Sequence, residues 1–338
     1  GADTLGHLCQ ASPGLRLPNL QELGLGNIGS FAGIQRTGQP SGCFGRLAPQ
    51  STGVNSLVGH WELAGLLWRA PGVGAPRGLP EDVMKSIEEG IGRAVLGNKS
   101  GTESEMLQEF GESHLRTGRP ILYVGSDADC HLAVHERMAP QDDLYRMART
   151  IRKLCKPAHQ ILRVVAHPFA GEVGAFAPTD GRKEFVLEPT GPTLLDVVRQ
   201  AGHPVTGIGR IEELFAGRGV SRSIPTSDRS DTMDETIRVL AGVPRGLLVA
   251  TLARPCEEGS PAGNHRDVAA GLEEFDRRLP DLLNILKPGD LLCLTADCGR
   301  DAGMAGAGCT REWVPLLVYG PRLAHGVNLG ARKTLADV

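Results

Sequence analysis

The sequence is poor in aromatic residues and contains no long apolar run. Phe, Trp and Tyr make up 4% of the 338 residues, and no stretch approaches the ~20 consecutive apolar residues that a membrane helix needs. Charge is nearly balanced, with 36 Lys and Arg against 39 Asp and Glu. A dedicated nucleic-acid-binding protein normally carries a basic excess. We therefore expect neither a membrane nor a nucleic acid as a partner.

Closely spaced cysteine pairs are also missing. The 8 cysteines are scattered, and none of them forms a C-x-x-C motif. The sequence opens on Gly1-Ala2-Asp3-Thr4, which is polar and unlike the start of a secretory leader. We therefore expect reduced thiols in a cytoplasmic protein and no disulfide framework.

Glycine and proline, by contrast, are abundant, with 45 and 23 residues. A chain of this length suggests about two domains at roughly 150 residues each. The Gly- and Pro-rich stretches at 70–76 and 189–192 are typical of crossings between two lobes.

Short apolar runs alternate with helical patterns along the chain. Strands are predicted over 120–124, 161–166, 246–250, 291–296 and 314–319. Helices are predicted over 104–116, 142–154, 194–200, 232–240 and 268–286. Ser100 and Glu103 have the spacing of a capping box. The alternation predicts an α/β fold with a mostly parallel sheet covered on both faces.

A polar loop leads into a helical pattern at Ser56. We expect Ser56 in the first turn of that helix, where free N–H groups and the helix dipole favour a phosphate. The alternative is that Ser56 or Asn55 only caps the helix. His60 lies one turn further on the same face, and on its own it fits a buried, hydrogen-bonded histidine equally well.

The apolar run at 291–296 ends in Asp297. Ligands of doubly wound sheets bind at the carboxyl ends of strands, so Asp297 is a candidate metal or phosphate-site residue. The alternative is an Asp that only forms a turn. Cys298 and Cys309 flank a loop rich in Gly and Ala. Their spacing matches no usual zinc site, and we expect two small buried residues.

Asp127, Asp129, His131 and His135 form a third polar cluster. Mixed Asp and His sets bind metals, but this spacing is generic, and a polar interface between lobes is the alternative.

Several of these segments, in this order, resemble the phosphopentomutases, a family of the alkaline-phosphatase superfamily. The matching segments are 1–7, 17–20, 23–28, 59–62, 97–99, 168–172, 295–297, 310–312 and 314–319. The resemblance implies an alkaline-phosphatase-like, doubly wound α/β core with a smaller α/β cap inserted into it. The core would contain residues 1–77 and 189–338, and the cap would contain residues 78–188.

The resemblance also implies an activity. Family members interconvert pentose 1-phosphates and 5-phosphates, ribose or deoxyribose, through a phosphothreonine and with two Mn²⁺ ions. This chemistry belongs to nucleoside salvage. Ser56 stands at the phosphothreonine position and keeps a hydroxyl group. The implied substrate is a small pentose phosphate, and the resemblance gives no oligomeric state.

The metal-binding positions depart from the family pattern. The family's Asp-His pair corresponds to Asp297 and Cys298, and the His before Thr-Arg-Glu corresponds to Cys309. The stretch 250–252 has no carboxylate, and His265 lies in a motif that matches only when shifted. A further metal-binding Asp would lie on a strand before Gly1. Because thiolates prefer Zn²⁺ to Mn²⁺, zinc or no metal is the alternative to two Mn²⁺.

In the cap, the resemblance implies substrate contacts from Asp127, His167 and Arg182. His167 replaces a family Arg, and a His is mostly neutral at pH 7. Two functional alternatives to the mutase remain: a degenerate family member that binds sugar phosphate without turnover, and a zinc-using phosphohydrolase.

Overall fold

The computed structural model describes residues 1–53, 55–69, 78–125, 129–252, 265–301 and 309–338. Contacts divide the chain into two compact units. The core unit contains the described residues of 1–69 and 189–338, and the cap unit contains those between 70 and 188. None of the helices in these ranges combines the length and apolarity needed to cross a bilayer.

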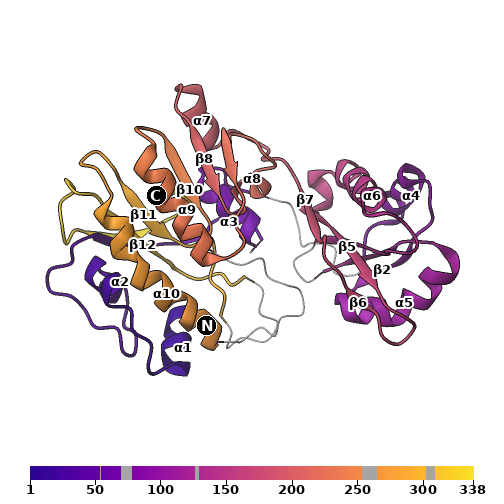
Figure 1. Ribbon diagram of the computed structural model, residues 1–338, viewed down its shortest axis with the longest axis horizontal. Helices are drawn as coiled ribbons and strands as arrows, with labels where there is room; N and C mark the ends of the chain where they lie inside the picture. Colours follow the sequence, from indigo (N-terminus) through magenta and orange to yellow (C-terminus); the bar gives the residue numbers. More distant parts are fainter. Residues whose placement is uncertain (54, 70–77, 126–128, 253–264, 302–308) are drawn as a thin grey trace. The chain divides into compact units, whose positions relative to one another are not determined.

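The core unit contains two sheets in its described residues (Figure 1). The first has the order β11-β12-β1-β13, from Leu292–Thr295, Val314–Tyr319, Cys43–Leu47 and Asn328–Arg332. In it, β12 is antiparallel to both neighbours, and β1 and β13 are parallel. The second sheet has the order β10-β8-β9, from Leu247–Ala250, Val205–Ile208 and Arg222–Ile224, and is parallel throughout.

Helices cover these sheets. They are α1 (Thr4–Ala11), α2 (Pro18–Leu23), α3 (Ser56–Leu63), α7 (Leu194–Gln200), α8 (Ile211–Leu214), α9 (Arg229–Gly242) and α10 (His265–Asn284), with 3₁₀ turns η1 (Leu25–Asn27) and η3 (Leu335–Asp337). The long helix α10 packs against α1, α2 and α9 (Figure 1). Leu8, Leu20, Leu279 and Leu317 meet there in one buried cluster, which fixes the helices on the first sheet.

The cap unit is a sheet with helices on both faces. The strand order is β2-β3-β4-β5-β6, from Leu96–Ser100, Ile121–Val124, Cys130–His135, Arg163–Ala170 and Ala177–Pro178, and β7 (Lys183–Val186) pairs with β5. Its helices are α4 (Glu81–Ile91), α5 (Glu103–Thr117) and α6 (Gln141–Leu154), with the 3₁₀ turn η2 (Pro157–His159). α4 and α6 share one buried cluster and α5 belongs to another, so every residue of β4 is buried.

Most predicted elements are confirmed within a few residues, and two predictions are wrong. The β11-β12-β1-β13 sheet and the cap sheet are mixed and not mostly parallel, in the cap partly because the connection from β3 to β4 is too short for a crossover helix. The β10-β8-β9 sheet is parallel, as predicted. The capping box of α5 is formed by Thr102 and Glu105, since the Glu105 amide donates to the Thr102 hydroxyl and the Thr102 amide to the Glu105 carboxylate. Ser100 cannot cap, because it is the last residue of β2.

Candidate functional site

Helix α3 begins at Ser56, and its cap is Asn55. The side-chain oxygen of Asn55 accepts a hydrogen bond from the amide of Val58 at 2.9 Å. The prediction that Ser56 lies in the first turn is confirmed, and of the two proposed capping residues Asn55 takes that role. The Ser56 hydroxyl is therefore not used as the helix cap.

His60 connects Ser56 to Asp297. Nδ1–H of His60 donates to the carbonyl oxygen of Ser56 at 2.8 Å. The same nitrogen lies 3.4 Å from the Ser56 hydroxyl oxygen and 3.6 Å from the Asp297 carboxylate. Asp297 follows β11 at the carboxyl end of the strand, as the sequence predicted for a site residue. One imidazole thus joins the first turn of α3 to that strand end.

Gly59 permits this close approach. A Cβ atom at position 59 would lie 2.1 Å from the carbonyl oxygen of Asp297, which is closer than real Cβ atoms come. Any side chain at this position would push α3 away from Asp297 and separate Ser56 from the strand end.

Two cysteine sulfurs lie beside Asp297. Cys298 and Cys309 form a disulfide with Cα atoms 5.8 Å apart. Hydrogen bonds in both directions between the backbones of Gly299 and Thr310, at 3.2 and 2.8 Å, hold the two segments together. The expectation of reduced, buried residues is therefore wrong for this pair, which is half-buried. Sequence spacing missed it because the backbone bridge, and not the intervening loop, sets the distance.

Asp297, Cys298 and Cys309 form a candidate metal-binding group. One ligand atom of each residue lies within 4.8 Å of the other two. His265, also a predicted ligand, is the first residue of α10 and lies outside this group. Its Nε2 atom is buried and has no hydrogen-bond partner among the described residues.

A cavity of about 1210 Å³ in the core unit adjoins this group. His60, Asp297 and Cys298 line it, together with Thr251 beyond the end of β10 and Glu312. The space is large enough for a sugar phosphate, since ligand cavities typically measure about 300–1,000 Å³.

Arg311 holds the loop that precedes α3. Its guanidinium donates to the carbonyl oxygens of Pro49, Ser51 and Gly53, at 2.8, 2.5 and 3.1 Å. Glu312, the next residue, accepts from the amide and the hydroxyl of Thr4 at 2.7 and 2.6 Å. The segment 310–312 therefore ties the N-terminal helix and the Ser56 loop to one point.

Glu62 also holds the loop that precedes α3. Its carboxylate accepts hydrogen bonds from the amides of Gln50, Ser51 and Leu335 and from the hydroxyl of Thr334. Burial acts to raise the pKa of Glu62, but these hydrogen bonds outweigh it and hold the pKa below its usual range. The carboxylate is therefore charged at neutral pH.

In the cap unit, His167 of β5 is buried within a polar cluster. Nδ1 of His167 lies 3.3 Å from the Glu103 carboxylate, and Nε2 lies 2.9 Å from Nδ1 of His131. Burial lowers the pKa of His167, and the Glu103 carboxylate only partly opposes this, while the charges of His131 and Arg182 lower it further. The side chain is therefore neutral at pH 7.

Arg182 comes directly before β7, whose pairing with β5 brings it near His167. Its guanidinium donates to Glu184 at 2.7 Å, and Arg163 contacts the same carboxylate at 3.3 Å. Asp127, the third predicted substrate contact, lies outside the described residues.

The third polar cluster forms no metal-binding group in the described part of the cap unit. Asp129 pairs with Arg163, His131 contacts His167, and Nε2 of His135 lies 3.0 Å from the carbonyl oxygen of Gly171. The contacts described for these side chains are with other groups of the cap unit.

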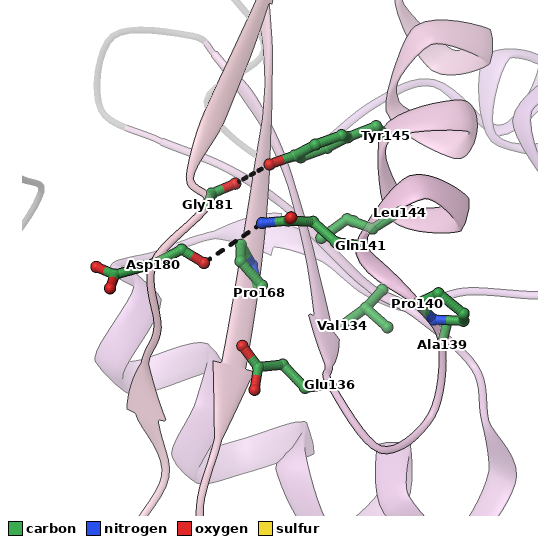
Figure 2. Close-up of a pocket in the computed structure, with 10 residues that line it drawn as sticks. All are labelled: Val134, Glu136, Ala139, Pro140, Gln141, Leu144, Tyr145, Pro168, Asp180 and Gly181. Atoms are coloured by element: carbon green, nitrogen blue, oxygen red, sulfur yellow. Dashed lines mark hydrogen bonds between the residues drawn. The ribbon is translucent and has the colours of Figure 1, made fainter.

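A pocket of about 600 Å³ in the cap unit lies beside the loop that carries Arg182 (Figure 2). Tyr145 of α6 donates its hydroxyl proton to the carbonyl oxygen of Gly181 at 2.7 Å. Gln141 donates to the carbonyl oxygen of Asp180 at 3.5 Å. Gly181 has φ +99°, and a Cβ atom there would lie 1.5 Å from the Gln141 amide nitrogen. Helix α6 thus fixes the loop from which Arg182 projects.

Sequence reasoning did not identify the structural roles of Glu62 and Arg311. Both lie in segments that it had noted, 59–62 and 310–312, but only as points of resemblance. A charged residue inside an otherwise apolar helix, as at Glu62, was the available signal. For Arg311 there was none, because its carbonyl partners are more than 250 residues away.

Comparison with known proteins first defines a broad class. The model of the Metalloenzyme superfamily matches residues 49–338. This class agrees with the α/β fold and with the donor group at Asp297.

Individual relatives define the class more narrowly. A phosphopentomutase from Caldanaerobacter subterraneus subsp. tengcongensis is 40% identical, with 100% of this chain and 86% of that protein covered. One from Alkaliphilus metalliredigens is 39% identical and one from Acetivibrio thermocellus is 40% identical, each with 100% of this chain and 87% of that protein covered. The chain belongs to the phosphopentomutase family.

Proposed function

We propose that the protein is a phosphopentomutase, which interconverts (deoxy)ribose 1-phosphate and (deoxy)ribose 5-phosphate through a phosphoenzyme on Ser56. The observation that carries this proposal is the connection from the Ser56 hydroxyl through His60 to Asp297. This connection supports a role for Ser56 as the nucleophile and for Asp297 as a metal-binding carboxylate. We expect the reaction to take place in the cytoplasm.

Ser56 supplies the attacking oxygen. As the first residue of α3, it lies where unpaired backbone N–H groups and the helix dipole stabilise a phosphoryl group. The Ser56 oxygen attacks phosphorus and loses its hydroxyl proton to solvent, and the sugar oxygen leaves with the bonding electron pair and takes up a proton. In the return step, the other hydroxyl of the same sugar loses its proton and takes the phosphoryl group, and the Ser56 oxygen leaves with the bonding pair and is protonated. His60 holds the geometry, because its Nδ1–H is donated to the Ser56 carbonyl.

With the Cys298–Cys309 disulfide reduced, Asp297, Cys298 and Cys309 would hold a metal ion, since their ligand atoms converge within 4.8 Å. A bound divalent ion supplies charge neutralisation for the transferring phosphoryl group and lowers the pKa of a nearby hydroxyl. Two sulfurs and one carboxylate are a soft donor set, so Zn²⁺ suits these three residues better than the Mn²⁺ pair of the family. The assignment of His265 as a further ligand finds no support in the geometry of the described residues.

We propose the roles of the two domains from the candidate residues that each domain contains. We assign residues 1–77 and 189–338 to a phosphoryl-transfer core and residues 78–188 to a cap that binds the sugar phosphate. Arg182 is the cationic phosphate contact of the cap. His167 is proposed as a substrate contact on the resemblance alone, since both of its ring nitrogens already face other side chains. Asp127 is proposed as a sugar contact on the resemblance alone.

The test is turnover of ribose 1-phosphate to ribose 5-phosphate, with Mn²⁺ and with Zn²⁺ in separate assays. Ser56→Ala should lower kcat by at least about 10⁴-fold, because the nucleophile is lost. Ser56→Thr is the matched control and should keep turnover, since it retains the hydroxyl. Mass spectrometry should find phosphate on the peptide containing residue 56 in the wild type and in Ser56→Thr, and no phosphate there in Ser56→Ala.

The outcomes separate the functional alternatives. Wild-type turnover no higher than that of Ser56→Ala would refute the mutase function. Pentose-phosphate binding without phosphorylated Ser56 would indicate a degenerate binding protein. Release of free phosphate without isomerisation would indicate a phosphohydrolase.

A further inference from the structure

We propose that Asp297, Cys298 and Cys309 form a thiolate metal site whose occupancy is controlled by thiol–disulfide exchange between the two cysteines. The proposal rests on the function proposed above, because it concerns the same site. It adds that the two sulfurs make this site responsive to oxidation.

The geometry allows both states with little backbone movement. The Gly299–Thr310 bridge holds the two cysteine segments at a Cα separation of 5.8 Å, which is within the usual range for a disulfide. The Asp297 carboxylate lies within 4.8 Å of both sulfurs. The same arrangement therefore fits a Cys298–Cys309 bond or an ion held by three donors.

The two states exclude each other. Zn²⁺ binds cysteine as the thiolate, and a disulfide sulfur carries no thiolate charge. Nη2 of Arg300 lies 3.8 Å from the Cys309 sulfur. Arg300 therefore offers a hydrogen-bond donor to this sulfur.

The exchange balances with a small-molecule disulfide as oxidant. The Cys309 thiolate attacks one sulfur of that disulfide, and a small thiolate leaves. The Cys298 thiolate then attacks the Cys309 sulfur, forms the protein disulfide and displaces a second small thiolate. Both protein sulfurs are oxidised and the small disulfide is reduced by two electrons. The two thiol protons pass to the small thiols, and any bound Zn²⁺ returns to solution. A small dithiol reverses the reaction.

Other described cysteines are poor competitors for this exchange. Cys9, Cys43, Cys130 and Cys155 are buried. Burial raises the pKa of the Cys130 and Cys155 thiols, and also that of Cys293 on the neighbouring strand β11. Oxidation should therefore select the Cys298–Cys309 pair.

The test uses the wild-type chain in two redox states. One sample is reduced with dithiothreitol and the other is oxidised with glutathione disulfide. Both are freed of small thiols, equilibrated with Zn²⁺ and desalted. We expect about one more Zn²⁺ per chain in the reduced sample by elemental mass spectrometry. Peptide mapping should find the Cys298–Cys309 crosslink only after oxidation, and Zn²⁺ should protect both residues from maleimide in the reduced state.

Two variants test whether Cys298 and Cys309 supply the Zn²⁺ ligands. Cys298→Ser with Cys309→Ser should bind Zn²⁺ at least about 100-fold more weakly, since even outer-shell changes cost 10–100-fold. Cys293→Ser is the matched control on β11 and should behave as the wild type. Equal Zn²⁺ content in both redox states, or no crosslink after oxidation, would overturn the proposal.

Metal content and thiol mapping are independent of turnover. A chain that shows redox-dependent Zn²⁺ binding but no mutase activity would retain this inference and refute the proposed function. A chain that shows mutase activity but no redox-dependent Zn²⁺ binding would refute this inference and retain the proposed function.

Discussion

Glu62 in the core unit and His167 in the cap unit are both almost fully buried, with 0% and 3% of their surface exposed, yet one keeps its charge and the other loses it. Glu62 receives hydrogen bonds from three backbone amides and one hydroxyl. His167 has one carboxylate neighbour, Glu103, against two groups that disfavour a positive charge, His131 and Arg182.

The comparison shows that burial sets the cost of a charge and that the partners decide whether the charge survives. In the core unit, the surviving charge organises the loop that carries Ser56. In the cap unit, the lost charge leaves Arg182 as the proposed cationic contact for a phosphate. The following predictions test this contrast.

The largest effect is expected for Glu62→Gln. The amide keeps one acceptor oxygen and points a donor NH₂ group at the amides that Glu62 now satisfies. Buried unsatisfied groups cost about 1–3 kcal/mol each, so the free energy of unfolding should fall by about 3 kcal/mol or more. Urea denaturation measures this change. Exposed Glu22→Gln in α2 is the control, and similar losses in both variants would contradict the role of Glu62.

Arg311→Lys should have the next largest effect. A lysine cannot reach three carbonyl oxygens in the directions that the guanidinium uses. We expect a loss of about 1–2 kcal/mol in unfolding free energy and a fall in kcat, because the loop before Ser56 loosens. Arg322→Lys, at an exposed position, should change neither quantity. An unchanged kcat in Arg311→Lys would show that the loop does not need this clamp.

Lowering the pH should reduce stability through His167 and through Glu62 over two different pH ranges. Burial lowers the pKa of His167 and of His114, so below about pH 6.5 the unfolded chain binds more protons than the folded one. Stability should fall as the pH decreases from about 7 to 5. The Glu62 contribution has the same sign but is lost only below about pH 4.3, the ordinary Glu pKa.

His167→Asn tests the histidine part of this pH dependence. The variant should show a shallower decrease in melting temperature between about pH 7 and 5 than the wild type. An identical slope in both proteins would mean that the pKa of His167 does not differ between the folded and the unfolded chain.

The smallest effect is expected for Tyr145→Phe in the cap unit. The variant loses one neutral hydrogen bond, to the Gly181 carbonyl, and should be less stable by about 0.5–1.5 kcal/mol. Calorimetric titration with ribose 5-phosphate should show weaker binding, because the loop before Arg182 is freer. Unchanged affinity would argue against positioning of Arg182 by α6.

Local patterns in the sequence were sufficient for many of the elements. The ranges of α7 and β12 agree with the predicted 194–200 and 314–319, because apolar periodicity depends on neighbouring residues. Apolar periodicity does not show whether a strand runs parallel or antiparallel to its neighbours in the sheet. The antiparallel pairing of β12 with β1 joins two segments that lie near opposite ends of the chain.

The sequence alone determined which residue types the candidate site contains: a hydroxyl at Ser56, a carboxylate at Asp297, and the two cysteines Cys298 and Cys309. Such identities follow from order along the chain. Only the tertiary structure decided that His60 joins the first two and that the Gly299–Thr310 bridge brings the two thiols together. Distances of this kind depend on side-chain and backbone contacts between separate elements, and no local periodicity encodes them.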